Sequence, residues 1–213
     1  MSQPSLFQDT TPPEDVGGIV IHRSMLDAAA QQALLSDIRG VLKVAPLVRP
    51  VTAWGKPMSV RMTSAGEAGW VIERGRYRYS RTHPETGAAW PAIPDSVLQV
   101  WRRTSGWPED PQSCLINWYA DGAKMGLHQD RDEGRFDAPV VSISLGDPAR
   151  FRVGGTDRKD PTQSTILQSG DVAVMGGASR LAFHGIDRIM FGEGTLLPDG
   201  GRINLTLRVL DPS

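Results

Sequence analysis

The chain has 213 residues, of which 39% are hydrophobic and 22% are charged, and its formal net charge is −1. These values indicate one globular domain with a sizeable core. No apolar stretch approaches the roughly 18 residues of a membrane-spanning helix, so we expect no membrane partner. The first fifteen residues lack the basic head and apolar run of a secretory signal, and a soluble cytoplasmic protein is expected. The single Cys114 has no disulfide partner and reads as a small buried side chain.

The first part of the chain predicts an arm, a strand and a helix. Residues 1–16 are expected to form a flexible arm, and residues 18–22 read as a short strand. Ser24 with Asp27 three positions later reads as an acidic version of a helix capping box. Apolar residues then recur near helical spacing, which predicts an amphipathic helix over about 25–43.

Hairpins and a second helix are expected in the next stretch. Five glycines interrupt residues 54–90, which indicates loops and short hairpins. Asp95 or Ser96 is placed to cap a helix that carries Val97 and Trp101 and ends near Gly106.

From Ser113 onward the pattern changes to short apolar runs. We expect strands over 115–119, 124–128, 140–145, 150–153, 164–167, 172–175, 181–184 and 202–210. Val141, Ile143 and Leu145 alternate with serines, as a sheet with two unlike faces requires. Eight short strands favour a sandwich or barrel, and we predict a mainly β (α+β) fold built on a double-stranded β-helix, or jelly roll.

A metal site is indicated by His128 and Asp130, which flank Gln129. On a strand, this spacing points both side chains to one face. His184, 54 positions after Asp130, completes a 2-His-1-carboxylate set if it lies on a neighbouring strand. Non-haem Fe(II) oxygenases use that set because it leaves one side of the ion open. The alternative is chance, because His-x-Asp is a short and common motif.

The last predicted strand places Arg202, Asn204, Thr206 and Arg208 on one face, opposite a run of apolar residues. Guanidinium groups on the inner wall of a small barrel need anionic partners, and a dicarboxylate would satisfy both. The alternative is an edge strand with a solvated basic face.

The charge is unevenly distributed. From Arg49 to Arg103 the chain has nine Lys or Arg against four acids. This excess can attract a phosphate backbone, although a solvated surface has the same composition.

Over about residues 17–209, the chain resembles the AlkB-type Fe(II)/2-oxoglutarate dioxygenases, most closely the bacterial DNA-repair member. The phrases L-H-x-D-x-D-E over 127–133 and R-x-N-x-T-x-R over 202–208 carry it most specifically. Further matches are Cys114–Tyr119, Val141–Gly146, Gly170–Val172, Ser179–Leu181 and His184–Ile186.

The resemblance implies roles for residues at matching positions. The iron ligands are then His128, Asp130 and His184, and 2-oxoglutarate is held by Asn117, Tyr119, Arg202, Asn204 and Arg208. Trp70 would stack on a flipped base against His128, while Tyr77 and Tyr79 would hold phosphate. Met62 and Asp132 would line the base pocket, and Arg158 would contact the substrate. Residues 17–112 would then supply helical support and a nucleotide-recognition lid, and residues 113–213 the catalytic core, as one structural unit.

The implied reaction is oxidative demethylation of N-alkylated bases such as 1-methyladenine and 3-methylcytosine. The substrate would be single- or double-stranded DNA, with RNA as a further class, and the reaction consumes O2 and 2-oxoglutarate and releases formaldehyde and succinate. A monomer is expected. One alternative is an Fe(II)/2-oxoglutarate hydroxylase acting on a protein or a small molecule, and another is a non-catalytic module with a structural zinc.

Three positions depart from the bacterial repair enzyme's pattern. Met175 stands for an aromatic residue, Gly126 for a small hydroxyl residue and Arg131 for a lysine. Each is expected to retune the pocket without removing a ligand. A calcium loop over 130–134 is excluded, because no ligand set of the required spacing follows.

Overall fold

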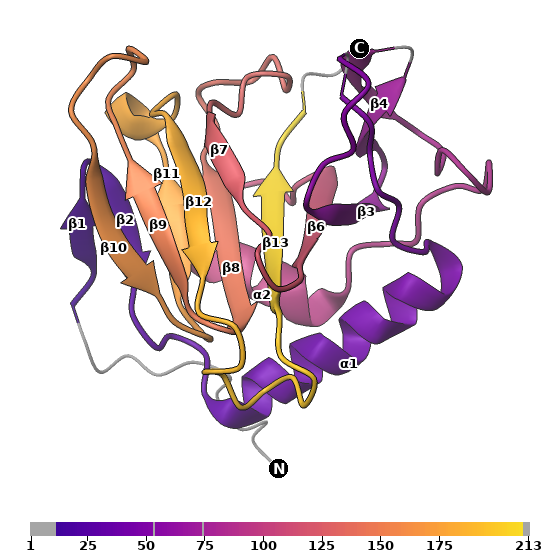
Figure 1. Cartoon of the computed structure of the whole chain (residues 1–213), viewed down its shortest axis with the longest axis horizontal. Coiled ribbons are helices and arrows are strands. Elements are labelled where there is room, and N and C mark those ends of the chain that lie inside the picture. Colours follow the sequence, from indigo (N-terminus) through magenta and orange to yellow (C-terminus); the bar gives the residue numbers. More distant parts are fainter. Residues whose placement is uncertain (1–11, 53, 74, 211–213) are drawn as a thin grey trace.

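Two antiparallel sheets pack face to face and confirm the predicted double-stranded β-helix (Figure 1). The structure is a computed structural model that describes residues 12–52, 54–73 and 75–210. The larger sheet has the order β1-β2-β11-β8-β13-β6-β3, and the smaller sheet has the order β10-β9-β12-β7. Strands β4 and β5 form a separate hairpin.

The elements follow the chain in the order β1 (Glu14–Val16), β2 (Ile19–His22), α1 (Ala28–Val44), β3 (Arg61–Gly66), β4 (Gly69–Glu73), β5 (Arg76–Ser80), α2 (Asp95–Thr104), β6 (Ser113–Tyr119), β7 (Met125–His128), β8 (Val140–Gly146), β9 (Ala149–Val153), β10 (Gln163–Leu167), β11 (Val172–Met175), the 3-10 helix η1 (Gly177–Ser179), β12 (His184–Ile189) and β13 (Arg202–Arg208).

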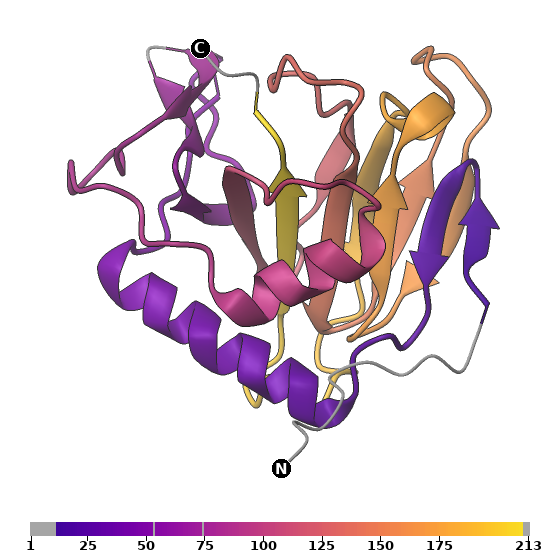
Figure 2. The same cartoon turned by 180° about the vertical axis from the view of Figure 1, so that it is seen from behind.

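The two helices cover the outer face of the larger sheet (Figure 2). Leu34 and Ile38 of α1, with Trp101 of α2, pack against the apolar face of β13, which carries Leu205. Cys114 is buried in this layer, as expected, and burial raises the pKa of its thiol to about 12. Within the described residues, no helix is both long and apolar enough to cross a membrane.

A second apolar layer fills part of the space between the sheets. Phe151 and Ile186 of the smaller sheet meet Leu115 and Met175 of the larger one. The remaining space between the sheets is a cavity lined by both apolar and polar side chains, and it holds the candidate site.

The start of the chain differs from its prediction at two points. Glu14–Val16 lies within the expected arm but pairs with Val20 and its neighbours as strand β1, whereas residues 1–11 lie outside the described residues. The N-cap of α1 is Asp27, which accepts a hydrogen bond from the Ala30 amide, instead of Ser24. Ser24 has a φ of 47° and donates its amide to the buried Asp171.

The strand predicted over 181–184 begins only at His184 and runs to Ile189. A turn bond from the Ala182 amide to the Ser179 carbonyl keeps the preceding apolar residues out of the sheet. At Gly185 an added Cβ would lie 2.6 Å from the Met125 carbonyl oxygen, so only glycine allows β7 and β12 to approach this closely.

Strand β13 is a central strand, which excludes the alternative of an edge strand with a solvated basic face. It pairs with β8 on one side and with β6 on the other along its whole length. Its polar residues therefore face the space between the sheets, while Ile203, Leu205 and Leu207 face the helices.

The buried Asp147 fixes the loop that leads into β13. Its carboxylate accepts hydrogen bonds from the amides of Gly192, Gly194 and Gly201. Because each bond reaches a charged acceptor, Asp147→Asn is expected to lower the free energy of unfolding by about 2–3 kcal/mol. Urea denaturation measures this loss. The matched control, Asp187→Asn, removes a half-exposed ion pair with Arg152 and should change stability by roughly 0.5 kcal/mol. Equal losses in the two variants would contradict this role of Asp147.

Candidate active site

Three potential metal ligands converge at one end of the smaller sheet. His128 ends β7 and lies opposite His184, the first residue of β12, in the strand pairing. Asp130 follows two residues after His128, and the ligand atoms of all three side chains lie within 4.8 Å of one another. The His128 Nε2 to Asp130 Oδ1 distance is 3.7 Å. The predicted 2-His-1-carboxylate cluster is therefore formed.

Both imidazoles are oriented by the backbone. His128 Nδ1 lies 2.9 Å from the Gly126 carbonyl, and His184 Nδ1 lies 3.0 Å from the Ala182 carbonyl. Because a carbonyl only accepts, each Nδ1 carries hydrogen, which leaves the Nε2 lone pair for a metal ion. Burial, with the neighbouring His128, lowers the pKa of His184 to about 4, so this ligand is neutral near pH 7.

Asp130 is held by Arg208. The Arg208 guanidinium donates to Asp130 Oδ2 through Nε at 3.1 Å and through Nη2 at 2.8 Å, and both side chains are buried. Burial by itself raises the pKa of Asp130, but the positive charge of Arg208 outweighs it and holds that pKa below the usual range. The carboxylate is therefore ionised, and its Oδ1 is available to a metal ion.

A buried network surrounds this pair, and sequence reasoning did not assign its members a role. Glu133 contacts Arg208 Nε at 3.2 Å and accepts from Arg180 Nη2 at 3.2 Å. Arg180 Nη1 also donates to the Asp130 carbonyl at 2.6 Å. Glu133 and Arg180 lie within the phrases that resemble the family, which was the only signal for them. Their burial among charged partners appears only in the fold.

The cluster opens into a cavity of about 380 Å³ between the sheets. The polar face of β13 forms one wall, as the alternation of polar and apolar residues along this strand predicted. The adjacent strand β6 adds Asn117 and Tyr119. The expected residues that line the cavity are Met62, Trp70, Tyr77, Asn117, Tyr119, His128, Asp130, Asp132, His184, Arg202, Asn204 and Arg208.

Several buried polar atoms on the cavity wall have no protein partner. They include Nε of Arg202, Nη1 of Arg208 and Oδ1 of Asn117. Arg202 is fully buried, and its hydrogen bonds reach the neutral oxygens Ser144 Oγ at 2.7 Å and Asp147 O at 3.4 Å. Burial lowers the pKa of Arg202 to about 10, which still leaves it charged. Because the buried Arg202 guanidinium is hydrogen-bonded to neutral oxygens, its charge would be compensated by an anion bound in the cavity.

Aromatic residues from the β4–β5 hairpin, which lies beside the main sheets in Figure 1, form another part of the cavity wall. Trp70 and Tyr77 stack with their ring centroids 5.2 Å apart and their planes 13° apart. Trp70 Nε1 donates to Asp132 Oδ2 at 2.9 Å, which joins the hairpin to the loop after β7. Arg78 also pairs with Glu73 across the two strands of the hairpin.

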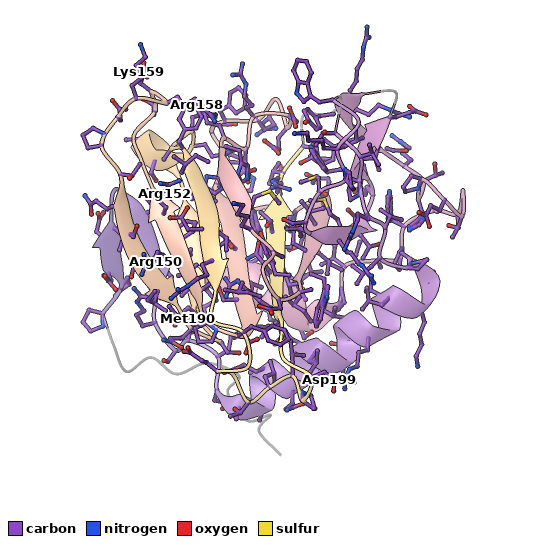
Figure 3. All side chains as sticks on the ribbon, in the orientation of Figure 1. Arg150, Arg152, Arg158, Lys159, Met190 and Asp199 are labelled. Atoms are coloured by element: carbon purple, nitrogen blue, oxygen red, sulfur yellow. The ribbon has the colours of Figure 1, made fainter. Side chains whose placement is uncertain are left out.

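Two expected substrate contacts lie outside this cavity. The Tyr79 hydroxyl donates to Glu133 Oε1 at 2.7 Å, and burial raises its pKa well above the usual value, so it is engaged inside the protein. Arg158 is exposed in the loop after β9 (Figure 3). Its guanidinium lies over the Phe183 ring. Its Nη1 donates to the Leu127 carbonyl at 3.3 Å.

The three departures from the family pattern all lie near the cluster. Met175 and Arg131 line the cavity. An added Cβ at Gly126 would meet no atom within 4 Å, so glycine at this position leaves open space beside β7.

Comparisons with known proteins agree with this geometry. Residues 18–208 match the family described as the 2OG-Fe(II) oxygenase superfamily. The chain is 52% identical over 193 residues to the "Alpha-ketoglutarate-dependent dioxygenase AlkB homolog" of Caulobacter vibrioides, covering 91% of this chain and 88% of that protein. It is 44% identical over 210 residues to "Alpha-ketoglutarate-dependent dioxygenase AlkB" of Escherichia coli, covering 95% and 96%.

A solved structure, that of OsALKBH1, superposes with a TM-score of 0.72 at 30% identity and covers 93% of this chain and all of that one. The match extends over the two sheets and the elements that surround them. The chain therefore belongs to the AlkB family of Fe(II)/2-oxoglutarate-dependent dioxygenases, with His128, Asp130 and His184 as its facial triad.

Proposed function

We propose that this enzyme removes alkyl groups from the ring nitrogens of nucleobases in DNA, with RNA as a second substrate class. One observation carries the proposal. The metal triad, a pair of buried arginines and a stacked aromatic pair all line one cavity. The bacterial relatives that match the chain over most of its length carry the AlkB name, which supports this reaction.

The triad residues fit iron. They offer two imidazole Nε2 atoms and one ionised carboxylate, which is the donor set that leaves open positions for further ligands. When bound, iron supplies the oxidation of the N-alkyl carbon, with 2-oxoglutarate and O2 as cosubstrates. The protein holds the reactants in place and excludes water, and formaldehyde and succinate are the products.

The cavity wall fits 2-oxoglutarate. Arg208 lies beside Asp130 and can hold a carboxylate near the metal, while Arg202 lies six residues earlier on the same face of β13. Six residues of strand span roughly 20 Å between the two Cα atoms, and two long side chains that converge can bracket a small diacid. Asn204 lies between the arginines on β13, with Asn117 opposite it on β6, and Tyr119 lies opposite Arg202; all three supply hydrogen-bonding groups to the cavity.

The hairpin and the loop after β7 fit a flipped base. The exposed indole surface of Trp70 offers a stacking face, and Met62 and Met58 add apolar surface. Asp132 accepts from Trp70 Nε1 and retains one oxygen for an exocyclic amine. Arg158 is placed for a phosphate outside the cavity, whereas Tyr79 supports the hairpin through Glu133. Both single- and double-stranded DNA are candidate substrates, and the acting unit is proposed to be a monomer.

The decisive measurement is repair of a defined lesion. We expect the iron-loaded protein, mixed without air with 2-oxoglutarate and an oligonucleotide bearing 1-methyladenine, to remove about 14 mass units once air is admitted. Binding to the oligonucleotide should weaken steeply with salt, because phosphates are engaged. Intact methylated strand at full iron occupancy would contradict the proposal. Salt-independent binding would favour a protein or small-molecule substrate.

Arg208→Lys tests the cosubstrate site. Lysine retains the charge but loses the planar fork, so we expect the Kd for 2-oxoglutarate to rise by roughly 10- to 100-fold. Calorimetry under anaerobic conditions measures this Kd, and titration of the metal alone checks the triad. The exposed Arg188→Lys serves as the matched control and should change neither value. Unchanged 2-oxoglutarate affinity in a folded Arg208→Lys protein would overturn the assignment.

Trp70→Ala tests the base-stacking role. Loss of one stacking face should raise KM for the methylated oligonucleotide by roughly 5- to 100-fold. Any consumption of 2-oxoglutarate in the absence of nucleic acid should be unchanged, because the hydrogen bond and ring contact of Trp70 go to Asp132 and Tyr77, outside the triad. Trp70→Phe should recover most of the affinity. A parallel loss of both activities would show that Trp70 acts through the fold.

A further inference from the structure

A small hairpin between α1 and β3 rises to the end of the molecule where the β4–β5 hairpin lies (Figures 1 and 2). Val51 pairs with Pro57, and the Met58 amide donates to the Pro50 carbonyl at 2.9 Å. The Thr52 amide and hydroxyl both donate to the Lys56 carbonyl, at 2.9 and 3.1 Å. Gly55, with a φ of 75°, closes the turn by donating its amide to the Thr52 carbonyl. These bonds join the two arms of the hairpin.

The tip presents a large apolar side chain to solvent. Trp54 is 88% exposed, whereas none of the other exposed large hydrophobic side chains of the described residues exceeds 56%. Hydration of an exposed indole is unfavourable, so a partner that covers the Trp54 ring would be stabilised by the hydrophobic effect, and tryptophan is enriched at interfaces. The catalytic cavity does not include Trp54 in its lining, so the reaction centre itself does not account for this residue.

The hairpin is continuous with the catalytic cavity. Thr52 and Met58, on its two arms, line that cavity. Thr52 and Gly55 also line a second cavity of about 510 Å³, which shares Trp70 with the first. Trp54 therefore lies two residues from the wall of the space proposed to receive a flipped base.

The charge of this segment favours a polyanion. Residues 44–61 contain Arg49, Lys56 and Arg61 and no Asp or Glu. Lys56 is exposed and lies two positions from Trp54 at the tip. A cation beside an exposed aromatic ring is the combination that holds single-stranded nucleic acid, because the ring takes a base and the cation takes a phosphate.

We propose that Trp54 stacks on the base that neighbours the flipped lesion in the substrate strand, while Lys56 contacts the adjoining phosphate. This inference rests on the proposed function, because it assumes a nucleic-acid substrate. The contact tolerates any sequence, since every base has a π-face, and it predicts a preference for oligonucleotides over free nucleotides.

The test compares three substrates that carry the same 1-methyladenine. One is an intact pentanucleotide, one is the same strand with abasic sites on both sides of the lesion, and one is the free 5′-mononucleotide. Trp54→Ala should lose roughly 5- to 30-fold in kcat/KM on the intact strand, mainly through KM. It should match the wild type on the other two substrates, which lack a neighbouring base. Trp54→Phe should restore most of the loss.

The control variant is Phe191→Ala. This side chain is also exposed but follows Met190, which lies toward the opposite end of the molecule from Arg158 (Figure 3). It should leave all three substrates unaffected, and denaturation should show that Trp54→Ala folds normally.

Each outcome decides a separate point. Suppose that the wild type repairs all three substrates and that Trp54→Ala repairs the intact strand equally well. This result overturns the stacking role of Trp54 and leaves the proposed function standing. An equal loss on the abasic strand also overturns the stacking role, because the effect then does not need the neighbouring base. A shift in oligomeric state in Trp54→Ala without a change in kcat/KM assigns the indole to a protein contact and overturns it too. A wild type that repairs none of them refutes the proposed function instead.

Discussion

The buried contact between Asp130 and Arg208 is the constraint on which the site depends. Removing two charges from water is costly, and here each is compensated by the other through two hydrogen bonds to one carboxylate oxygen. The arrangement leaves the second oxygen of Asp130 facing the histidines. Loss of Arg208 would leave the buried Asp130 carboxylate without its cation, and loss of Asp130 would leave Arg208 paired with Glu133 alone, so Asp130 and Arg208 form a single unit.

The loop after β7 connects the metal ligand Asp130 to the β4–β5 hairpin. Asp130, Asp132 and Glu133 lie within four residues, and they bind Arg208, Trp70 and Tyr79 respectively. Arg180 fixes this loop from the far side through its bonds to the Asp130 carbonyl and to Glu133. The β4–β5 hairpin, proposed to recognise the substrate, and the triad are therefore attached to one short charged segment, in which Asp130 and Glu133 are buried and Asp132 is exposed.

The two faces of the larger sheet have separate roles, one in apolar packing and the other in binding. Helices α1 and α2 bury one face of the larger sheet, which supplies the main core. Its other face is polar along β13 and is left open toward the cavity. Buried polar atoms without a partner on that wall lower the free energy of unfolding, and the packing of the helices against the other face of the same strands compensates this loss.

The sequence by itself determined which residues can bind metal and diacid, because the period of two along a strand fixes which side chains share a face. His128 with Asp130, and Arg202 with Arg208, were predicted in this way, and the apolar alternation predicted the strand-rich fold. It did not determine the helix cap at Asp27, the start of β12 at His184 or the burial of Glu133 and Arg180. Those depend on which segments meet across the fold: a close approach of β7 to β12 at Gly185, and a charged network closed by residues about fifty positions apart. Local propensity contains no information about such distant partners, so only the tertiary structure decided them.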